Sequence, residues 1–304
     1  MSLTEKAMIA RVNIKGPWNA AGEDEAESLA IARRKGISED VYRAIKKLLD
    51  PKRVPTLKAF TSARSTMRTK HRQMTLAWEE KGGRLLPVTM YFDYMQEMGT
   101  LKQKVEDTYR DFCNDIPSLK LQFQTDPSTA NAYREEDWPD PAELIAKFEV
   151  RLRITPLADA DHFLCKIGEE EERRIKEDCS KDIYGKVVGG LAELVSDLKK
   201  VVEESLASIA KYETDSQGKV LHTFKDTAVL NVRKITATAR KLNVLNDPTL
   251  NQLLDQIDAN LGRKDPQVLR DNYVQRKQVV ADAGDMVKKL AQIESALFRA
   301  AEAA

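Results

Sequence analysis

A row of basic side chains is the clearest candidate for chemistry in this 304-residue sequence. Arg64, Arg68 and Arg72 recur at every fourth residue, which places their guanidinium groups along one side of a helix, and Lys58 roughly extends that side. Guanidinium groups in such a row can contact a phosphate backbone, where they release condensed counterions. The row therefore predicts a nucleic-acid contact on a basic helix over residues 56–81.

The distribution of charge offers two alternatives for the same row. Residues 1–84 hold 18 Lys/Arg against 10 Asp/Glu, residues 85–180 hold 12 against 21, and residues 181–304 hold 19 against 17. The net charges are thus +8, −9 and +2, in agreement with the +1 of the whole chain. The row is then a solvated helix face, or it docks on the acidic middle third, and we favour these interpretations over a nucleic-acid site.

Three other residues suggest a metal site. His162 and Cys165 lie three positions apart, on one face of a helix, and Cys179 follows. Imidazoles and thiolates are zinc ligands, but this spacing lacks a paired C-x-x-C and a fourth ligand, and His222 would have to come from a distant helix. Small buried cysteines and a hydrogen-bonded histidine explain these residues better, so we expect no metal.

Motifs for enzyme chemistry are missing from the sequence. It contains no G-x-S-x-G elbow, no G-x-x-x-x-G-K-[ST] loop and no G-x-G-x-x-G. Carboxylate pairs such as Asp159 and Asp161 carry little information in a chain with 48 Asp and Glu residues. Gly189-Gly190 lies inside an apolar stripe, where it allows a close approach of helices or a bend. We therefore expect no enzyme activity and no cofactor.

The cysteines and the N-terminus indicate a cytoplasmic protein. Three cysteines are too few for a disulfide framework, and the first six residues lack the apolar core of a signal peptide. The longest candidate for a membrane span, Leu85–Phe92, has eight residues, against the roughly 20 that cross a bilayer. We expect no membrane segment.

Helical periodicity dominates the last third of the chain. A buried stripe returns every three or four positions: Ile183, Val187, Leu191, Leu194, Leu198, Val202, Leu206 and Ile209. Helices are predicted over residues 182–212, 219–242, 248–261 and 266–301, with Asp247-Pro248 and Asp265-Pro266 as caps. Short links favour antiparallel neighbours, so we expect a long helical hairpin or bundle in which the second helix answers the fourth. The a/d seam is too irregular for a long parallel coiled coil.

The first half of the chain predicts four helices and one loop. The helices run over residues 23–35, from Ser38 to Leu49, over 56–81 and over 90–113. In the second of these, Val41, Ile45, Leu48 and Leu49 are expected to be buried. The exit of the fourth is expected at Ile116 and Pro117. The polar stretch 125–141 is expected to be a surface loop pinned by Trp138.

Two segments favour a short pair of strands. Residues 8–14 place Met8, Ala10, Val12 and Ile14 on one side, and residues 148–155 alternate apolar and polar side chains. A helix that begins after Pro141 is the competing interpretation of the second segment. The predicted fold is mainly α: an elongated helical bundle with this strand pair. Its regions are a basic helical one over 1–124, an acidic connector over 125–180 and the helical hairpin over 181–304.

Several turns and caps carry a resemblance. Ile45-x-x-Leu48-Leu49-Asp50-Pro51 precedes the basic helix, Gly82-Gly83 breaks it, the loop Trp138-Pro139 leads to Phe148, and Leu242-Asn243-Val244-Leu245-Asn246-Asp247-Pro248-Thr249-Leu250 comes late. This pattern, over most of the chain, resembles an uncharacterised helical family encoded by phages, prophages and some bacteria. Genes of this family are found beside genes for MoxR-type AAA ATPases and von Willebrand A-domain proteins. The resemblance therefore implies that the protein acts with a partner, and it supplies no catalytic residues.

These observations together predict a non-enzymatic interaction or assembly protein of phage or prophage origin. It would self-associate or partner an ATPase-linked complex such as a MoxR-type ATPase. The alternative is a nucleic-acid-binding protein that uses the basic helix, and an enzyme without a recognisable motif comes third.

Overall fold

The chain forms two compact units. A computed structural model describes residues 3–18, 20–38, 41, 44–79, 82–157, 169–214 and 220–303. Unit 1 comprises Met1–Arg11, Arg72–Tyr94 and Arg153–Ala304, and unit 2 comprises Val12–His71 and Met95–Leu152. Each unit thus combines distant stretches of sequence, and the units do not coincide with the regions 1–124, 125–180 and 181–304.

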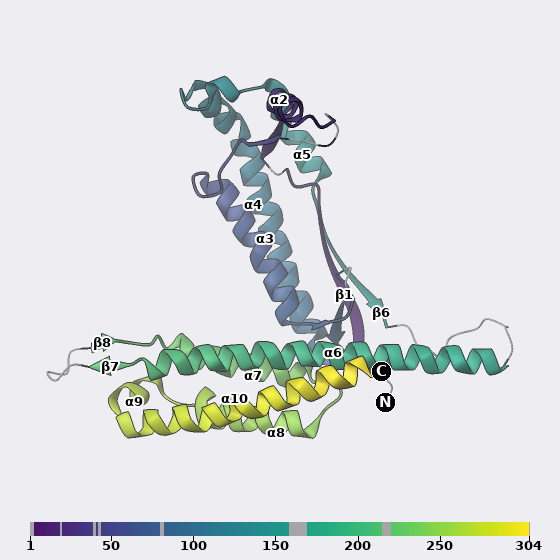
Figure 1. Cartoon of the computed structure of the whole chain (residues 1–304), viewed down its shortest axis with the longest axis vertical. Helices are drawn as coiled ribbons and strands as arrows, with labels where there is room; N and C mark the ends of the chain where they lie inside the picture. Colours follow the sequence, from purple (N-terminus) through teal and green to yellow (C-terminus); the bar gives the residue numbers. More distant parts are fainter. Residues whose placement is uncertain are drawn as a thin grey trace. The chain divides into compact units, whose positions relative to one another are not determined.

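The secondary structure is mainly helical, as predicted, and it includes a four-stranded sheet (Figure 1). In chain order the elements are α1 (Leu3–Lys6), β1 (Ala7–Lys15), β2 (Ala21–Asp24), α2 (Glu25–Lys35), β3 (Ala44–Lys47), α3 (Pro55–Gln73), β4 (Leu76–Ala77), β5 (Arg84–Pro87), η2 (Val88–Met90), α4 (Tyr91–Thr125), η3 (Ala130–Ala132), η4 (Glu135–Asp137), α5 (Pro141–Lys147), β6 (Glu149–Pro156), α6 (Glu169–Ala210), β7 (Glu213–Thr214), β8 (Val220–His222), α7 (Thr227–Leu242), α8 (Pro248–Ile257), η6 (Asp258–Gly262), α9 (Pro266–Asp271) and α10 (Tyr273–Glu302).

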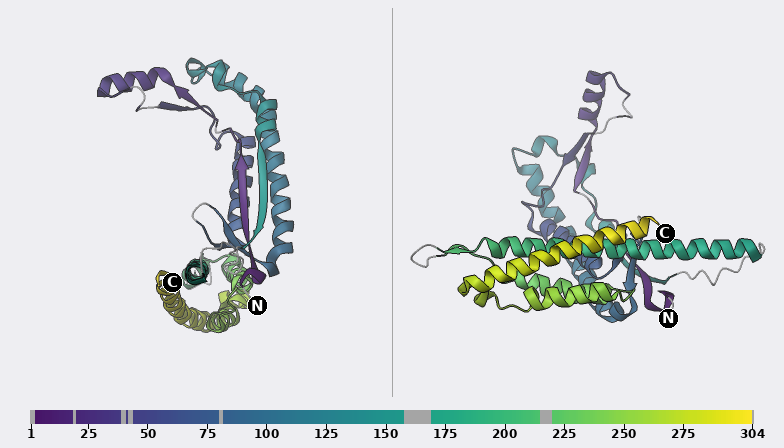
Figure 2. Two further views of the ribbon diagram at one scale, coloured as in Figure 1. Left: turned by 90° about the vertical axis from the view of Figure 1, so that its right-hand side faces the viewer. Right: turned by 60° about the horizontal axis from the view of Figure 1, so that its bottom comes forward.

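The predicted pair of strands is confirmed as β1 and β6, which are neighbours in the sheet order β4-β5-β1-β6 (Figures 1 and 2). The competing helix is also present, but only as the short α5 before β6. Strand β5 pairs antiparallel with β1, from Ala7 opposite Pro87 to Ala10 opposite Arg84. The sequence missed β4 and β5 because strands of two and four residues are too short to show an alternation.

Aromatic side chains form the core of unit 2. The ring of Tyr109 stacks on Phe148 with centroids 3.9 Å apart and lies 4.8 Å from that of Phe60. The ring of Trp18 lies 5.7 Å from that of Trp138, whose side chain is only 6% exposed. Trp138 therefore pins the polar stretch before α5, as the sequence predicted.

The prediction of a helix from Ser38 to Leu49 is wrong. Strand β3 pairs antiparallel with β2 within this stretch, and alternate residues of β3 face opposite sides. Ile45 is consequently 73% exposed and Val41 70% exposed, although Leu48 and Leu49 are buried as expected. On the inner side, Lys46 forms an ion pair with Asp137 at 2.5 Å, which holds β3 in place.

The prediction that α4 ends at Ile116 and Pro117 is also wrong, since the helix continues through the proline to Thr125. A proline inside a helix removes one hydrogen bond and costs roughly 3 kcal/mol. Ile116, Leu119 and Phe123 are buried along the same face, and each such side chain contributes about 1.5–3 kcal/mol. Their burial offsets the cost of the proline, so the apolar pattern decides where the helix ends.

Helix α6 organises the rest of unit 1. Its buried stripe is confirmed from Val187 to Ile209, and the helix begins at Glu169, well before the predicted residue 182. Both α7 and α10 pack against α6 (Figures 1 and 2). The pairing of α7 with α10 and the simple long hairpin are therefore not confirmed. The caps are confirmed, since the carboxylates of Asp247 and Asp265 accept hydrogen bonds from backbone N–H groups.

Candidate nucleic-acid interface

The basic row lies on α3, which is shorter than predicted. The helix begins at Pro55, whose fixed φ suits a first helical position, and ends at Gln73, before β4. One face is buried through side chains at helical spacing: Leu57, Phe60, Ala63, Met67 and His71. The buried face fixes how the helix is rotated, and it therefore decides which cations reach solvent.

Of the four predicted contact residues, Arg64 lies at the edge of this face, Arg68 and Arg72 lie further round the helix, and Lys58 lies on the opposite side. From Arg64 to Arg72, each step of four residues turns the helix by about 40°, so these three arginines run obliquely from the edge of the buried face. Arg64, at that edge, is half-buried, whereas Lys58, Arg68 and Arg72 are exposed. From Lys58 to Arg72 the row extends about 21 Å along the helix axis.

The side chain of Arg64 packs over an aromatic ring of the same helix. Its guanidinium carbon lies 5.4 Å from the centroid of Phe60, a cation–π contact. Burial lowers the pKa of the Arg64 guanidinium, and the like charge of Arg68 lowers it further. The two guanidinium groups thus repel each other, and an anion between them would relieve this repulsion.

Helix α3 carries an unbalanced positive charge. Its 19 residues include five Lys/Arg and no Asp or Glu. Lys70, on the other side of the buried face, pairs with Glu97 of α4 at 3.6 Å. Within the part of the chain that the structure describes, Lys58, Arg64, Arg68 and Arg72 form no ion pair. The docking of this row on the acidic middle third, which the sequence favoured, is therefore not found among the described residues.

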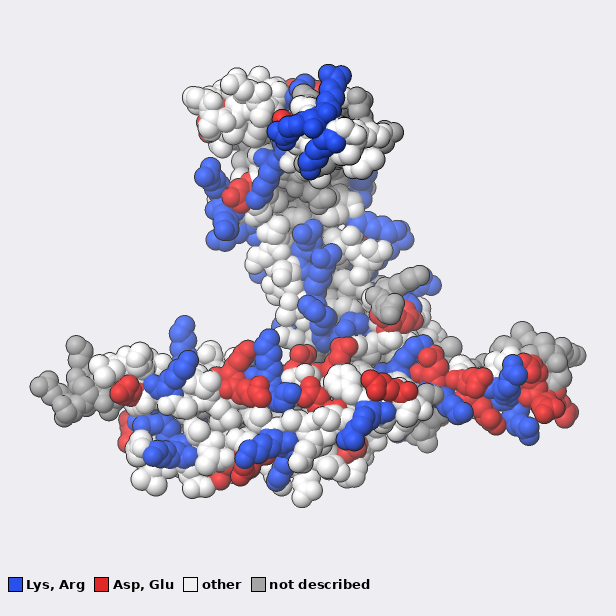
Figure 3. Space-filling view, in the orientation of Figure 1, with Lys and Arg blue, Asp and Glu red and all other residues white. Residues whose placement is uncertain are grey.

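Positive and negative side chains gather on different elements of the visible surface (Figure 3). Lys and Arg side chains run along the visible face that contains α3, whereas Asp and Glu side chains gather along α6. Hydroxyl groups, which sequence reasoning overlooked, add to the α3 surface: Ser62, Ser65 and Thr69 are exposed there. Hydroxyls and guanidinium groups both donate hydrogen bonds to phosphate oxygens.

Arg72 also marks the end of the helix. Its carbonyl oxygen accepts a hydrogen bond from the backbone N–H of Thr75 at 3.4 Å, and the Thr75 hydroxyl accepts one from Arg84 at 2.8 Å. These bonds turn the chain from α3 into β4. The side chain of Arg72 remains exposed.

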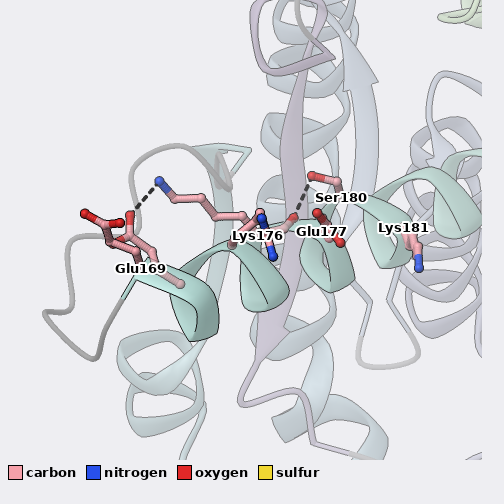
Figure 4. Close-up of a pocket in the computed structure, with 7 residues that line it drawn as sticks. Glu169, Lys176, Glu177, Ser180 and Lys181 are labelled. Atoms are coloured by element: carbon pink, nitrogen blue, oxygen red, sulfur yellow. Dashed lines mark hydrogen bonds and ion pairs between the residues drawn. The ribbon is translucent and has the colours of Figure 1, made fainter.

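The hollow at the start of α6 is lined by six charged residues and one serine of the same helix (Figure 4). Lys176 pairs there with Glu172 at 2.8 Å, and the Ser180 hydroxyl donates to the Lys176 carbonyl oxygen at 2.8 Å. Neighbouring side chains of this kind, at i and i+4, stabilise the helix itself. The hollow therefore offers no second candidate site.

Most of the other sequence candidates fall outside the part of the chain that the structure describes. Asp159, Asp161, His162 and Cys165 lie outside the described residues, and Cys179 is half-buried on α6. In the described ranges, no group of three His, Cys, Asp or Glu side chains could hold a metal ion. Among these residues, no helix is both long enough and apolar enough to span a membrane.

Comparisons with protein-family models, with curated proteins and with solved structures found no match to this chain. The resemblance to the phage-encoded family accordingly remains a prediction.

Proposed function

We propose that this chain is a non-enzymatic binding protein and that its basic row on α3 binds the phosphate backbone of a nucleic acid. The observation that carries the proposal is a helix with five cations and no carboxylate, four of whose cations form no ion pair within the described ranges. A row of cations without internal partners is favourably placed for an external polyanion. Lys58, Arg64, Arg68 and Arg72 would bind, and the exposed hydroxyls would position, the phosphates.

Charge reversal on the exposed part of the row tests this function. The variant Lys58→Glu/Arg68→Glu/Arg72→Glu should lose a salt-sensitive mobility shift with DNA or RNA and keep the melting temperature of the parent. Stability should be unchanged because these three side chains are exposed and unpaired within the described residues.

Lys70→Glu is the matched control, because it reverses a charge on the same helix at a position that pairs with Glu97. It should keep the shift. Nucleic-acid binding by this row would be refuted if the parent protein gave no mobility shift at low salt. It would also be refuted if the reversal variant melted at a much lower temperature than a parent that gives no shift.

Assembly with a protein partner is the second candidate function. The observation that favours it is the exposure of large apolar side chains: Phe92 is 82% exposed, and Val274 is 76% exposed. Exposed apolar surface of this kind marks contact sites when it is contiguous. The partner would be a second copy or, as the family resemblance implies, a MoxR-type ATPase in the cytoplasm of a bacterium that carries the phage or prophage.

Light scattering tests self-association, since assembly predicts a mass above the 34.3 kDa of one chain. A pull-down from phage-infected or lysogenic cells, with mass spectrometry of the co-purified proteins, tests the second kind of partner. A strictly monomeric protein that recovers no partner would count against assembly.

A further inference from the structure

We infer that two carboxylates of α6, those of Glu193 and Asp197, weaken phosphate binding at Arg72 and so end the phosphate-binding surface there. This inference rests on the proposed function, and it adds which residues oppose the binding of phosphate. Arg72 and both carboxylates belong to unit 1, so their surroundings are described within a single unit.

Close packing of α6 on β4 places the two carboxylates. A methyl group on Gly190 would lie 2.7 Å from the carbonyl oxygen of Ala77, so this side of α6 faces β4. Ala77 is in turn the partner of Arg84 in the antiparallel pair of β4 and β5. Glu193 and Asp197 follow Gly190 by about one and two turns and project within about 60° of its direction. Both carboxylates therefore lie on the side of α6 that faces the strand next to Arg84.

Arg84 connects this side of α6 with the end of α3. Its guanidinium donates hydrogen bonds to the hydroxyl of Thr75 at 2.8 Å, to the carbonyl oxygen of Thr75 at 3.0 Å and to that of Arg72 at 3.5 Å. Burial lowers the pKa of the Arg84 guanidinium; the charges of Glu193 and Asp197 raise this pKa, and the charge of Arg72 lowers it. The charges of both carboxylates and of Arg72 thus act on the same guanidinium.

Neither carboxylate is neutralised by a direct contact. Glu193 and Asp197 are exposed, and in the described ranges of the chain they form no ion pair, in contrast to Lys199, which pairs with Glu294. Their negative charge therefore remains at the surface, beside the end of α3. A phosphate that contacts Arg72 would be repelled by these carboxylates.

The size of this repulsion can be estimated from Coulomb's law. Two unit charges about 10 Å apart in water change a binding constant by about twofold. Reversal of both carboxylates changes four units of charge, which corresponds to about 16-fold without screening. At about 0.1 M salt, where the Debye length is about 10 Å, screening reduces this effect to about threefold.

Fluorescence anisotropy with the full chain tests the inference, with a DNA duplex and a single-stranded RNA as probes. Glu193→Lys/Asp197→Lys should bind the better probe about threefold more tightly than the parent at about 0.1 M salt. The matched control is Glu177→Lys/Asp178→Lys, which makes the same change of net charge at exposed residues of the same helix. Glu177 lies about 24 Å from Glu193 along the helix axis, so screening should leave the affinity of the control within about 1.3-fold of the parent.

A second variant guards against misfolding, because two lysines beside Arg84 could lower the stability of this corner. Glu193→Gln/Asp197→Asn makes half of the charge change and should bind about 1.7-fold more tightly than the parent at about 0.1 M salt. For both variants the gain in affinity should shrink toward zero as the salt concentration rises.

The outcomes separate the inference from the proposed function. If Lys58→Glu/Arg68→Glu/Arg72→Glu abolishes binding but Glu193→Gln/Asp197→Asn binds like the parent, the inference is overturned and nucleic-acid binding by the row stands. The same holds if the control at residues 177 and 178 binds as tightly as Glu193→Lys/Asp197→Lys, because net charge alone would then explain the gain. The absence of binding to either probe at low salt, or binding that survives reversal of the row, would overturn both.

Discussion

Two adjacent glycines of α6 should respond in opposite ways to the same substitution. A methyl group on Gly190 would lie 2.7 Å from the carbonyl oxygen of Ala77 and 3.2 Å from the Cβ of Leu76, both in β4. A methyl group on Gly189 would meet only the Cβ of Ala301, at the ordinary distance of 3.9 Å. The chain therefore needs a glycine at position 190 and tolerates alanine at position 189.

The magnitudes follow from helix propensity and overpacking. Alanine in place of glycine stabilises a helix interior by up to about 1 kcal/mol, so Gly189→Ala should raise the free energy of unfolding by this amount. Gly190→Ala gains the same propensity and pays about 1–3 kcal/mol for overpacking, because the nearest atom is backbone that cannot rotate away. The two variants should differ by about 1–3 kcal/mol.

Thermal unfolding measures this difference, which corresponds to about 2–4 °C for each kcal/mol in a unit of this size. Gly284→Ala in α10 is a second control, because its methyl group would meet no atom within 4 Å. If Gly190→Ala melts at or above the temperature of Gly189→Ala, α6 does not approach β4 as closely as the structure shows.

Substitutions at three further positions test the two cores and one ion pair. Leu198 is fully buried in α6, so Leu198→Asp should lower the free energy of unfolding on the order of several kcal/mol and Leu198→Met by less than about 1.5 kcal/mol. Urea unfolding would distinguish the two variants, and equal midpoints would mean that the buried face is assigned wrongly. The Tyr109 hydroxyl donates to one backbone group of segment 16–18 and accepts from another, so Tyr109→Phe should lower the unfolding free energy by about 1–3 kcal/mol. A hydrogen bond from Lys199 lowers the pKa of Glu294, so the pair stabilises the fold above the ordinary glutamate pKa of about 4.3, and this contribution is lost as the pH falls through the lowered pKa. Melting temperatures of the parent and of Glu294→Gln should therefore differ at pH 7 and converge in acid; a constant difference would exclude this linkage.

Sequence periodicity predicted the long elements and failed at the short ones. The stripe through Leu198 and the strand pair β1 and β6 were visible because each repeats its period several times. Strand β3 has only four residues, and Ile45 fits a helical spacing there as well as an exposed strand position. The position of β3 depends on its pairing with β2 and on the ion pair of Lys46 with Asp137. Both partners lie outside the segment 38–49, so the pattern of that segment alone could not predict the strand.

The candidate site was predictable in its residues and not in its surroundings. The spacing of Arg64, Arg68 and Arg72 placed them on one helix, which the structure bears out. Whether a carboxylate meets them is a question of tertiary packing, and net charge alone pointed to the acidic middle third. Acidic residues of that third pair elsewhere, as Glu97 does with Lys70 and Asp93 with Lys241. Charge totals therefore indicate neutrality without showing which partners achieve it.

The aromatic core of unit 2 has a spectroscopic consequence. Of the three tryptophans, Trp18 and Trp138 are in contact in unit 2, while Trp78 lies in unit 1, with the ammonium of Lys186 5.8 Å from its ring centroid. In a Trp78→Phe variant, all tryptophan emission would report on unit 2, and in a Trp18→Phe/Trp138→Phe variant all of it would report on unit 1. Each unit thus carries its own optical label, so the order in which the two units unfold can be followed in the intact chain.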